Sequence, residues 1–526
     1  MKTKTIILTV VTSVCAVFSS CEKMLDIQQQ GVLNLDTYYQ TDEQATSAVM
    51  QCYYQWQVNY TGNYNIYNAL SDDCYGPGGG RGENTTLNEY QFTNTYAGTF
   101  AKDYKLVYYA NLVLENVEPD TPAKQTCIAE AHFFRAWAYL DLVMDYGTPP
   151  LVTETLKDPS NYAQPNGDKA EIWKLIEDDF LYAVNSGALP SKASKTDVIV
   201  RLTKEAAEAY LGKAYLFEGK YTEAAAMLKK VIDSNLYELG GIENFANIGH
   251  VAGNGCPEYI FATRGYNDDQ TNLYRINGLP PYFYGCWRFQ DAFAVPFYSP
   301  LFSYGQGYGW LQGIRKGLFD EFEAGDLRRP YTTMSFPEAQ AAYGLTMINA
   351  TAVAYGVEGY LRTKNVYKTE DDLDFNWYEW YAFGNKANIP EMRLANVYLM
   401  YAEACIKTGS TAGNAYIDAV RARAGLGAPA NYNMDEIIHE RRVELAMEQC
   451  RYLDLLRWGL CEQYLSDQGS KCPAFSGMNE DGTFNVDWRG PMGSTYGWKK
   501  GKHELFPFPQ TERNVNDKLV QNPNWE

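Results

Sequence analysis

The stretch that most constrains the fold is "AYLGKAYLFEGKYTEAAAMLKKVI", residues 209–232. Its apolar and small residues recur at helical spacing on both sides of Gly219, which predicts two helices joined by a short turn. Gly212 and Ala224 are small where the two helices must approach closely, and Tyr221 and Leu228 can fill the space between them. The sequence therefore predicts a helix–turn–helix unit here.

This pattern is that of a tetratricopeptide repeat. The matching positions are Leu211, Gly212, Tyr215, Gly219, Tyr221 and Ala224. Only one copy is clear in the sequence, and a stack of such units needs neighbours to bury its faces. We expect these neighbours in the helical segments 390–408, 413–424 and 434–449.

Further helices are predicted in the first third of the chain. Asp42 can cap a helix that begins with "DEQATSAVMQCYYQW". Helices are also expected over 99–118 and 123–146, the second ended by Pro149 and Pro150. The segment 72–98, which separates the first of these helices from the helix over 99–118, contains "DDCYGPGGGRGENTT", which predicts a loop. This loop lacks the Gly-Lys-Ser/Thr ending of a nucleotide-binding P-loop.

The chain changes character over residues 240–388, which are rich in Gly, Pro, Tyr, Trp and Asn and have few periodic runs. Residues 279–310 alone contain twelve aromatic rings. A flat sugar face carries C–H groups that stack on such rings, and its edge hydroxyls need Asn, Asp, Gln or Arg. The alternative is that the rings pack together inside a loop-rich subdomain.

We expect the loop 72–98 and the segment 279–310 to form an extended platform for a glycan. The predicted stacking residues are Tyr75, Tyr284, Trp287, Tyr308 and Trp310, and the predicted hydrogen-bonding residues are Asp73 and Arg81. If the platform lies elsewhere, the next expected place is around Trp377, Trp380 and Tyr381.

The N-terminus has the pattern of a bacterial lipoprotein signal. Lys2 and Lys4 precede an uncharged apolar run from Ile6 to Phe18, which is too short for a membrane span. Small residues then lead into Cys21, the predicted first mature residue and site of lipidation. The alternative is a plain secretory signal followed by an unmodified cysteine.

Charge and motif content exclude several classes of protein. The formal net charge is −19, and loss of residues 1–20 with their two lysines makes it −21. Such an acidic chain repels phosphate backbones, which argues against nucleic-acid binding. The four histidines form no HExxH motif or Cys/His cluster, and Gly-x-Ser-x-Gly is absent. We therefore expect no enzyme activity, no cofactor and no metal site.

Seven segments, in order along the chain, resemble the SusD/RagB family of outer-membrane nutrient-binding lipoproteins. They are "YYQTDEQATSAV" (38–49), "AEAHFFRAWAYLDLVMDYGTPPLV" (129–152), "RLTKEAAEAYLGKAYLFEGKY" (201–221), "IPEMRLANVYLMYAEA" (389–404), "VRARAGL" (420–426) with "HERRVELAMEQCRYLDLLRWG" (439–459), and "LFPFPQTERNVNDKLVQNPNW" (505–525). Asn396 stands where the family pattern has an acid.

The resemblance implies a mainly α-helical fold, with a scaffold of tetratricopeptide-like helical pairs and a large loop-rich insert. After a signal peptide at 1–20, residues 21–526 would form one domain. Its scaffold would occupy about 36–238 and 389–465, its insert about 240–388, and an irregular C-terminal segment 466–526. The resemblance also implies a lipid-anchored protein of the outer membrane at the cell surface. Such a protein passes captured glycan to a SusC-like, TonB-dependent transporter.

The charged residues of these segments are expected to support the scaffold. Glu440, Arg441, Arg442, Glu444 and Arg451 have the spacing of helix-packing ion pairs. Glu440 and Glu444 lie four residues apart on one helix, so they cannot readily flank a sugar as a glycosidase acid pair.

Arg135 and Glu130 are expected to form a further structural pair.

Two other functions remain open at this stage. The chain could be a glycoside hydrolase with an unrecognised carboxylate pair, or a purely structural tetratricopeptide adaptor. The sequence does not decide which glycan is bound, or whether the cargo is a peptide.

Overall fold

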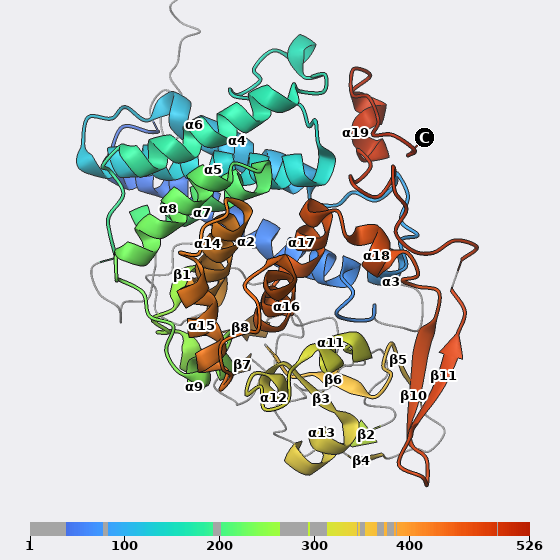
Figure 1. Cartoon of the computed structure of the whole chain (residues 1–526). Helices are drawn as coiled ribbons and strands as arrows, with labels where there is room; N and C mark the ends of the chain where they lie inside the picture. The colour runs from blue at the N-terminus through green and yellow to red at the C-terminus, as the bar shows by residue number, and fades with distance from the viewer. Residues whose placement is uncertain are drawn as a thin grey trace, which may run out of the picture.

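Helices that pack side by side form the scaffold of the computed structural model (Figure 1). The structure describes residues 38–76, 83–192, 201–263, 293–294, 313–343, 346–347, 353–364, 373–375, 383–385, 387–491 and 493–525. The mainly α-helical fold predicted from the sequence is confirmed.

The first part of the scaffold is a run of helices in the first half of the chain. They are α2 (Asp42–Leu70), α3 (Glu83–Asn88), α4 (Phe100–Asn116), α5 (Pro122–Tyr146), α6 (Lys169–Asn185), α7 (Lys204–Glu218), α8 (Tyr221–Asp233) and α9 (Ile242–Ala246), with 3-10 turns at Pro159–Asn161 and Val251–Gly253. Helices α4 to α8 each pack against the next in the chain. This arrangement builds a continuous layer from neighbouring helical pairs.

The second part of the scaffold extends this layer from the C-terminal side. It consists of α14 (Leu394–Lys407), α15 (Asn414–Arg423), α16 (Met434–Leu445), α17 (Cys450–Trp458) and α18 (Cys461–Leu465), with α19 (Gln510–Val515) near the end of the chain. Helix α14 packs directly against α8, and α15 and α16 pack against α14. The predicted neighbours of the repeat are therefore confirmed.

Local sequence explains where several of these helices begin and end. The side chain of Thr41 caps α2 and forms a capping box with Gln44, so Asp42 lies inside the helix and is not the cap we expected. The turn between α7 and α8 uses Gly219 with a φ of 87°, a conformation that glycine adopts without steric cost. Helix α14 starts only at Leu394, because the preceding residues, including Pro390, form a strand.

The close contact predicted inside the repeat is present. A Cβ atom added to Gly212 of α7 would lie 2.6 Å from Cγ of Leu228 in α8. Ala224 is fully buried in the same contact region. Small residues therefore set the spacing of this helical pair.

The scaffold core is rich in aromatic side chains that meet edge to face. Phe133 of α5 packs against Tyr210 of α7 with ring centroids 5.2 Å apart, and against Phe261 with centroids 5.6 Å apart. Trp56 of α2 lies 4.3 Å from the same Phe261 ring. Such pairs add to the free energy gained by burying the rings. They fix the strand that carries Phe261 against the helices.

That strand is β1 (Tyr259–Thr263), which pairs antiparallel with β9 (Ile389–Arg393). The two strands lie at the start and the end of the insert, so the insert leaves and rejoins the scaffold at one place. The half-buried Glu391 in β9 accepts hydrogen bonds at its carboxylate from the indole N–H groups of Trp56 and Trp137, both at 2.8 Å.

The described part of the insert consists of short elements. They are α11 (Lys316–Glu321), α12 (Arg329–Thr332), α13 (Phe336–Tyr343), β2 (Phe293–Ala294), β3 (Thr333–Ser335), β4 (Thr346–Met347), β5 (Ala354–Tyr355), β6 (Tyr360–Arg362), β7 (Leu373–Phe375) and β8 (Phe383–Asn385). Strand β3 pairs with β6, β2 with β4, and β7 with β8.

The C-terminal segment, which we expected to be irregular, contains a β-hairpin of β10 (Cys472–Met478) and β11 (Phe484–Arg489). Strand β5 of the insert adds to it, so the sheet order is β11-β10-β5. In Figure 1 this hairpin runs along one edge of the molecule beside the insert, away from helices α4 to α6. Among the described residues, no helix is both long and apolar enough to cross a membrane.

Candidate functional site

The segment that follows α2 enters the junction of the scaffold and the insert. Asp73, a predicted ligand-binding residue, is only 1% exposed and accepts a hydrogen bond from Nε of Arg442 at 2.9 Å. Its neighbour Asp72 is paired with Nε of Arg451 at 2.7 Å. Asp73 therefore lies below the surface, where its carboxylate fixes the start of the loop to α16.

Tyr75, a predicted stacking residue, is also largely covered. Its side chain is 6% exposed, and the guanidinium carbon of Arg315 lies 4.2 Å above the ring centroid. The ring of Trp488 in β11 meets it at an interplanar angle of 61°, with centroids 6.5 Å apart. Burial raises the pKa of the Tyr75 phenol above its ordinary value, even though Arg315 acts to lower it.

Trp488 is a residue that our sequence interpretation missed. Its side chain is 45% exposed, whereas most large aromatic side chains described in the scaffold are buried. The sequence did contain a signal for the hairpin that carries it. "MNEDGTFNVDW" (478–488) has an Asp-Gly pair followed by alternating polar and apolar residues, which is typical of a β-hairpin.

The other residues expected at the platform lie outside the described residues. They are Arg81, Tyr284, Trp287, Tyr308 and Trp310, and the alternative site at Trp377, Trp380 and Tyr381. Cys21, the predicted lipidation site, also lies outside them. Of the seven residues expected to bind the ligand, the structure thus places only Asp73 and Tyr75, close together in one segment.

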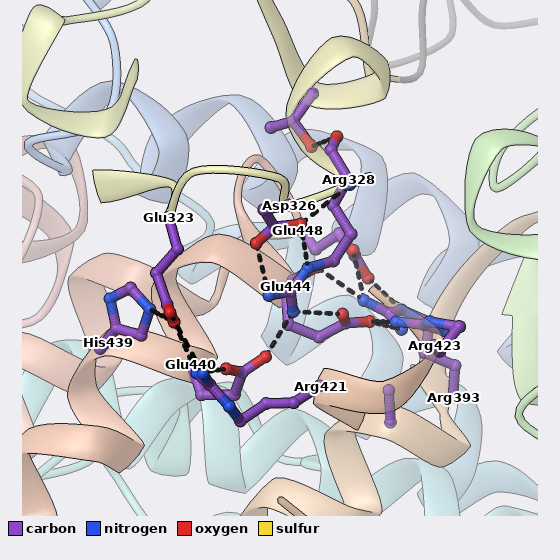
Figure 2. A network of polar contacts seen from close by, with 12 residues as sticks. Glu323, Asp326, Arg328, Arg393, Arg421, Arg423, His439, Glu440, Glu444 and Glu448 are labelled. Atoms are coloured by element: carbon purple, nitrogen blue, oxygen red, sulfur yellow. Dashed lines mark hydrogen bonds and ion pairs between the residues drawn. The ribbon is translucent and has the colours of Figure 1, made fainter. Parts of the chain in front are cut away.

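The carboxylates of α16 belong to a buried ionic network (Figure 2). Figure 2 shows Arg328, Arg393 and Arg423 around Glu444. Glu444 accepts hydrogen bonds from Arg393 at 2.6 Å, from Arg328 at 3.1 Å and from Arg423. Glu440 pairs with Arg328 and, at 3.3 Å, with Arg421. Both glutamates are fully buried.

Burial alone would raise the pKa of Glu444. Arg423, Arg393 and Arg328 outweigh this effect and hold the pKa of Glu444 well below its ordinary value. A carboxylate kept ionised by three guanidiniums and shielded from solvent is unsuited to transfer protons to a substrate. The expected packing role of Glu440, Arg441, Arg442, Glu444 and Arg451 is confirmed, because each makes an ion pair with another element of the fold.

The network extends from α16 to the insert. Glu321 and Glu323, at and just beyond the end of α11, contact His439 of α16 at 2.7 and 3.4 Å. Burial acts to lower the pKa of His439, but the hydrogen bond to Glu321 and the charges of Glu440 and Glu436 outweigh burial and raise it. The insert is therefore attached to the scaffold partly through a titratable contact.

The pair expected between Arg135 and Glu130 is wrong. Arg135 pairs with Asp179 of α6, with Nε 2.7 Å from Oδ2, and Glu130 pairs with Arg201. Residues five apart on a helix lie on different faces, so the two side chains reach different neighbours.

The scaffold interior offers no room for a sugar in its described cavity. A hollow of about 50 Å³ between α5, α7, α14 and α17 is lined by polar groups that include Asp141, Lys213 and Arg441. Since roughly 10–15 Å³ of such space is needed to hold one water molecule, this hollow has room for a few waters. A shallow groove of about 730 Å³ also lies between α6 and the α7–α8 turn, next to Trp173 and Phe217.

Among the described residues, no group of His, Cys, Asp and Glu side chains is arranged to hold a metal ion.

Comparison with protein-family models now decides the family. The model described as "SusD family" matches residues 306–525, and the model described as "Starch-binding associating with outer membrane" matches residues 12–216. The chain belongs to the SusD family.

Individual members of the SusD family resemble the chain over nearly its whole length. A SusD-like protein of Bacteroides ovatus is 25% identical over 519 residues, covering 93% of this chain and 86% of that protein. SusD-like protein P25 of Formosa agariphila is 23% identical over 523 residues, covering 87% of this chain and 91% of that protein. The resemblance that we found in the sequence motifs is thereby confirmed.

Solved structures of SusD-like proteins have the same fold. A laminarin-binding SusD-like protein superposes with a TM-score of 0.71 at 25% identity, over 92% of this chain and 99% of that chain. Surface glycan-binding protein A from Bacteroides fluxus has a TM-score of 0.71 at 19% identity, over 92% of this chain and 99% of that chain. The second likeness shows the fold alone.

Proposed function

We propose that this member of the SusD family is a glycan-binding lipoprotein of the cell surface that has no catalytic activity of its own. The observation that carries the proposal is the match, over 92% of the chain, to a structure named for laminarin binding. The buried state of Glu440 and Glu444 supports binding without hydrolysis, since neither carboxylate is open to a substrate.

The binding surface is proposed to lie at the junction of the segment 72–98, the insert and the hairpin β10–β11. Residues Glu83–Asn88 of this segment form α3 and not the loop that we expected. Tyr284, Trp287, Tyr308 and Trp310 remain the proposed stacking residues of the insert, with Arg81 of the loop as a hydrogen-bonding residue. Asp73 and Tyr75 support this surface from below through Arg442 and Arg315.

Purified protein incubated with laminarin, starch and a panel of other polysaccharides tests the function. Retardation in a native gel that contains the polysaccharide, with no shortened product after long incubation, is the expected result. Shortened product would identify a glycoside hydrolase, and absence of retardation on every polysaccharide would contradict glycan binding.

Alanine variants of Trp287 and Trp310 test the proposed platform. We expect weaker retardation with an unchanged melting temperature. Loss of stability in both variants, or unchanged binding in both, would place the site elsewhere, with Trp377, Trp380 and Tyr381 next to be tested.

We further propose that the protein is anchored in the outer membrane through lipidated Cys21 and delivers its glycan to a SusC-like, TonB-dependent transporter. Membership of the SusD family and the family description "associating with outer membrane" support this step. Mild detergent extraction of outer membranes that carry a tagged chain should recover a large barrel protein together with it. Recovery of the tagged chain alone would contradict the partnership.

A further inference from the structure

Trp488 occupies an unusual place at the end of a row of side chains on the hairpin. Successive side chains of a strand alternate between its faces, so Phe484, Val486 and Trp488 of β11 share one face. Phe484 is packed against Tyr360 and Phe475, with ring centroids 5.3 and 6.0 Å away. The row therefore starts within the packed part of the insert and ends at a ring that is 45% exposed.

The buried part of Trp488 is supported by a stack that joins three regions of the chain. The indole contacts Tyr75, and Arg315 lies on the Tyr75 ring. Arg315 is itself held by its Nε donating to the carbonyl oxygen of Cys74 at 3.0 Å. On the hairpin, Trp488 lies opposite Pro473 of β10. These contacts orient the ring before any ligand arrives, which lowers the entropic cost of binding.

The charged side chains on either side of Trp488 in the strand point away from its ring. Asp487 and Arg489 alternate with Trp488 and thus point to the other face of the sheet, where the Arg489 guanidinium carbon lies 4.3 Å from the Tyr355 ring centroid. A large, flat ring with an electron-rich face favours weakly positive C–H groups over an anion. The aligned axial C–H groups of a neutral pyranose have this character. The ring also lies beside Tyr75, in the segment that leads into the proposed platform.

We propose that Trp488 is a sugar-stacking residue that extends the glycan-binding surface onto the C-terminal hairpin, with Tyr75 and Arg315 as its positioning residues. This inference rests on the proposed glycan-binding function and adds a subsite that takes one neutral pyranose ring. A polymer bound across the loop 72–98 would then be held at one end by the hairpin.

The test compares Trp488→Ala with Trp488→Phe and with the control Tyr108→Ala. Tyr108 is also a largely exposed aromatic residue, at 50%, but it lies on α4, far from the hairpin in Figure 1. The probe is laminarin, with affinity measured by titration calorimetry. If wild type does not bind laminarin, the probe is the polysaccharide that binds most tightly in the panel.

Trp488→Ala is expected to bind roughly ten- to a hundredfold more weakly, as is typical when one aromatic stacking surface is removed. Trp488→Phe should retain most of the affinity, and Tyr108→Ala all of it. Because the ring is partly exposed, the melting temperature of Trp488→Phe should stay close to that of wild type. Ligand binding should also shift tryptophan fluorescence in wild type and shift it less in Trp488→Phe.

The outcomes separate this inference from the proposed function. If wild type binds a glycan and Trp488→Ala binds as well as Tyr108→Ala does, the subsite is refuted while glycan binding stands. An unchanged fluorescence response in Trp488→Phe would also refute it, even if Trp488→Ala were poorly folded. If wild type binds no glycan of the panel, the proposed function itself fails.

Discussion

Glu444→Gln tests the buried network most directly. The amide has nearly the shape of the carboxylate, so the substitution removes one negative charge and leaves the volume unchanged. Arg328, Arg393 and Arg423, whose side chains are at most 1% exposed, would lose the negative charge that they share, and one of the two acceptor oxygens would become an amide N–H donor facing a guanidinium. Removing one partner of a buried ion pair costs about 3–5 kcal/mol, because an uncompensated charge stays buried.

This cost converts into a measurable shift in melting temperature. Unfolding entropy of about 2.1 cal/mol/K per residue gives roughly 1 kcal/mol/K for a chain of about 500 residues. We therefore expect Glu444→Gln to lower the melting temperature by about 3–5 °C, as measured by circular dichroism at pH 7. Glycan affinity, measured below this transition, should be that of wild type.

Glu338→Gln is the matched control. Glu338 is likewise paired with arginine and accepts two hydrogen bonds from Arg329, at 2.6 and 2.9 Å, but its side chain is 39% exposed. An exposed pair of this kind contributes about 0–1 kcal/mol, so the control should shift the melting temperature by at most about 1 °C. Equal shifts in the two variants, or a Glu444→Gln variant as stable as wild type, would refute the reasoning.

The pH dependence provides a second check on Glu444. Its folded-state pKa lies below the unfolded value of about 4.3, so its contribution is complete above that value and is lost as the pH falls through the folded pKa. The difference in unfolding free energy between wild type and Glu444→Gln should therefore be constant from pH 7 to pH 5 and become smaller below about pH 4. A gap that is already closed at pH 5 would contradict the low pKa.

Three further predictions concern the anchor, the repeat and the insert. Cys21→Ala should release the protein from the membrane fraction and abolish incorporation of labelled fatty acid; a variant that stays membrane-bound, with a wild type that incorporates no label, would contradict lipidation. Ala224→Leu should overpack the α7–α8 contact and cost about 1–3 kcal/mol in urea unfolding, whereas Ala226→Leu on the exposed face of the same helix should be nearly neutral. His439→Gln should be less stable than wild type mainly below about pH 6.5. Glu321, Glu440 and Glu436 raise the pKa of His439 in the folded protein. The contribution of His439 to stability is therefore complete below about pH 6.5, its ordinary pKa, and is lost as the pH rises through the folded-state pKa. A stability difference that is the same at pH 6 and pH 9 would contradict the charged contact of His439 with Glu321 and Glu323.

The scaffold could be predicted from the sequence because its signals are local. Gly212, the turn at Gly219 and Leu228, which packs against Gly212, all lie within one helical pair, 16 residues from the first to the last. The charged run of α16 could be recognised as structural for a similar reason, since its charges fall on several faces of one helix. Its partners could not be predicted, because Arg328, which pairs with Glu440, lies more than 100 residues away and no local pattern marks it.

The candidate site was harder to predict because composition does not indicate burial. Asp73 and Tyr75 belong to a Gly-rich, polar stretch that is typical of an exposed loop, yet ion pairing with Arg442 and packing with Arg315 cover both side chains. The exposed ring lies instead on Trp488, which meets Tyr75 from about 410 residues further along the chain. Only the folded structure brings these two residues together.

The pairing of β5 with β10, and of Arg328 and Arg393 with Glu444 of α16, has a consequence for the order of folding. These contacts join residues that are far apart in the sequence. Each can form only after residues beyond 433 have been synthesised, long after the segment that they contact. Until then Arg328 and Arg393 lack the carboxylate of Glu444 and the edge of β5 is open, both of which favour misfolding and aggregation. Premature termination before Met434 should therefore yield a chain that proteases degrade, and not a smaller folded protein.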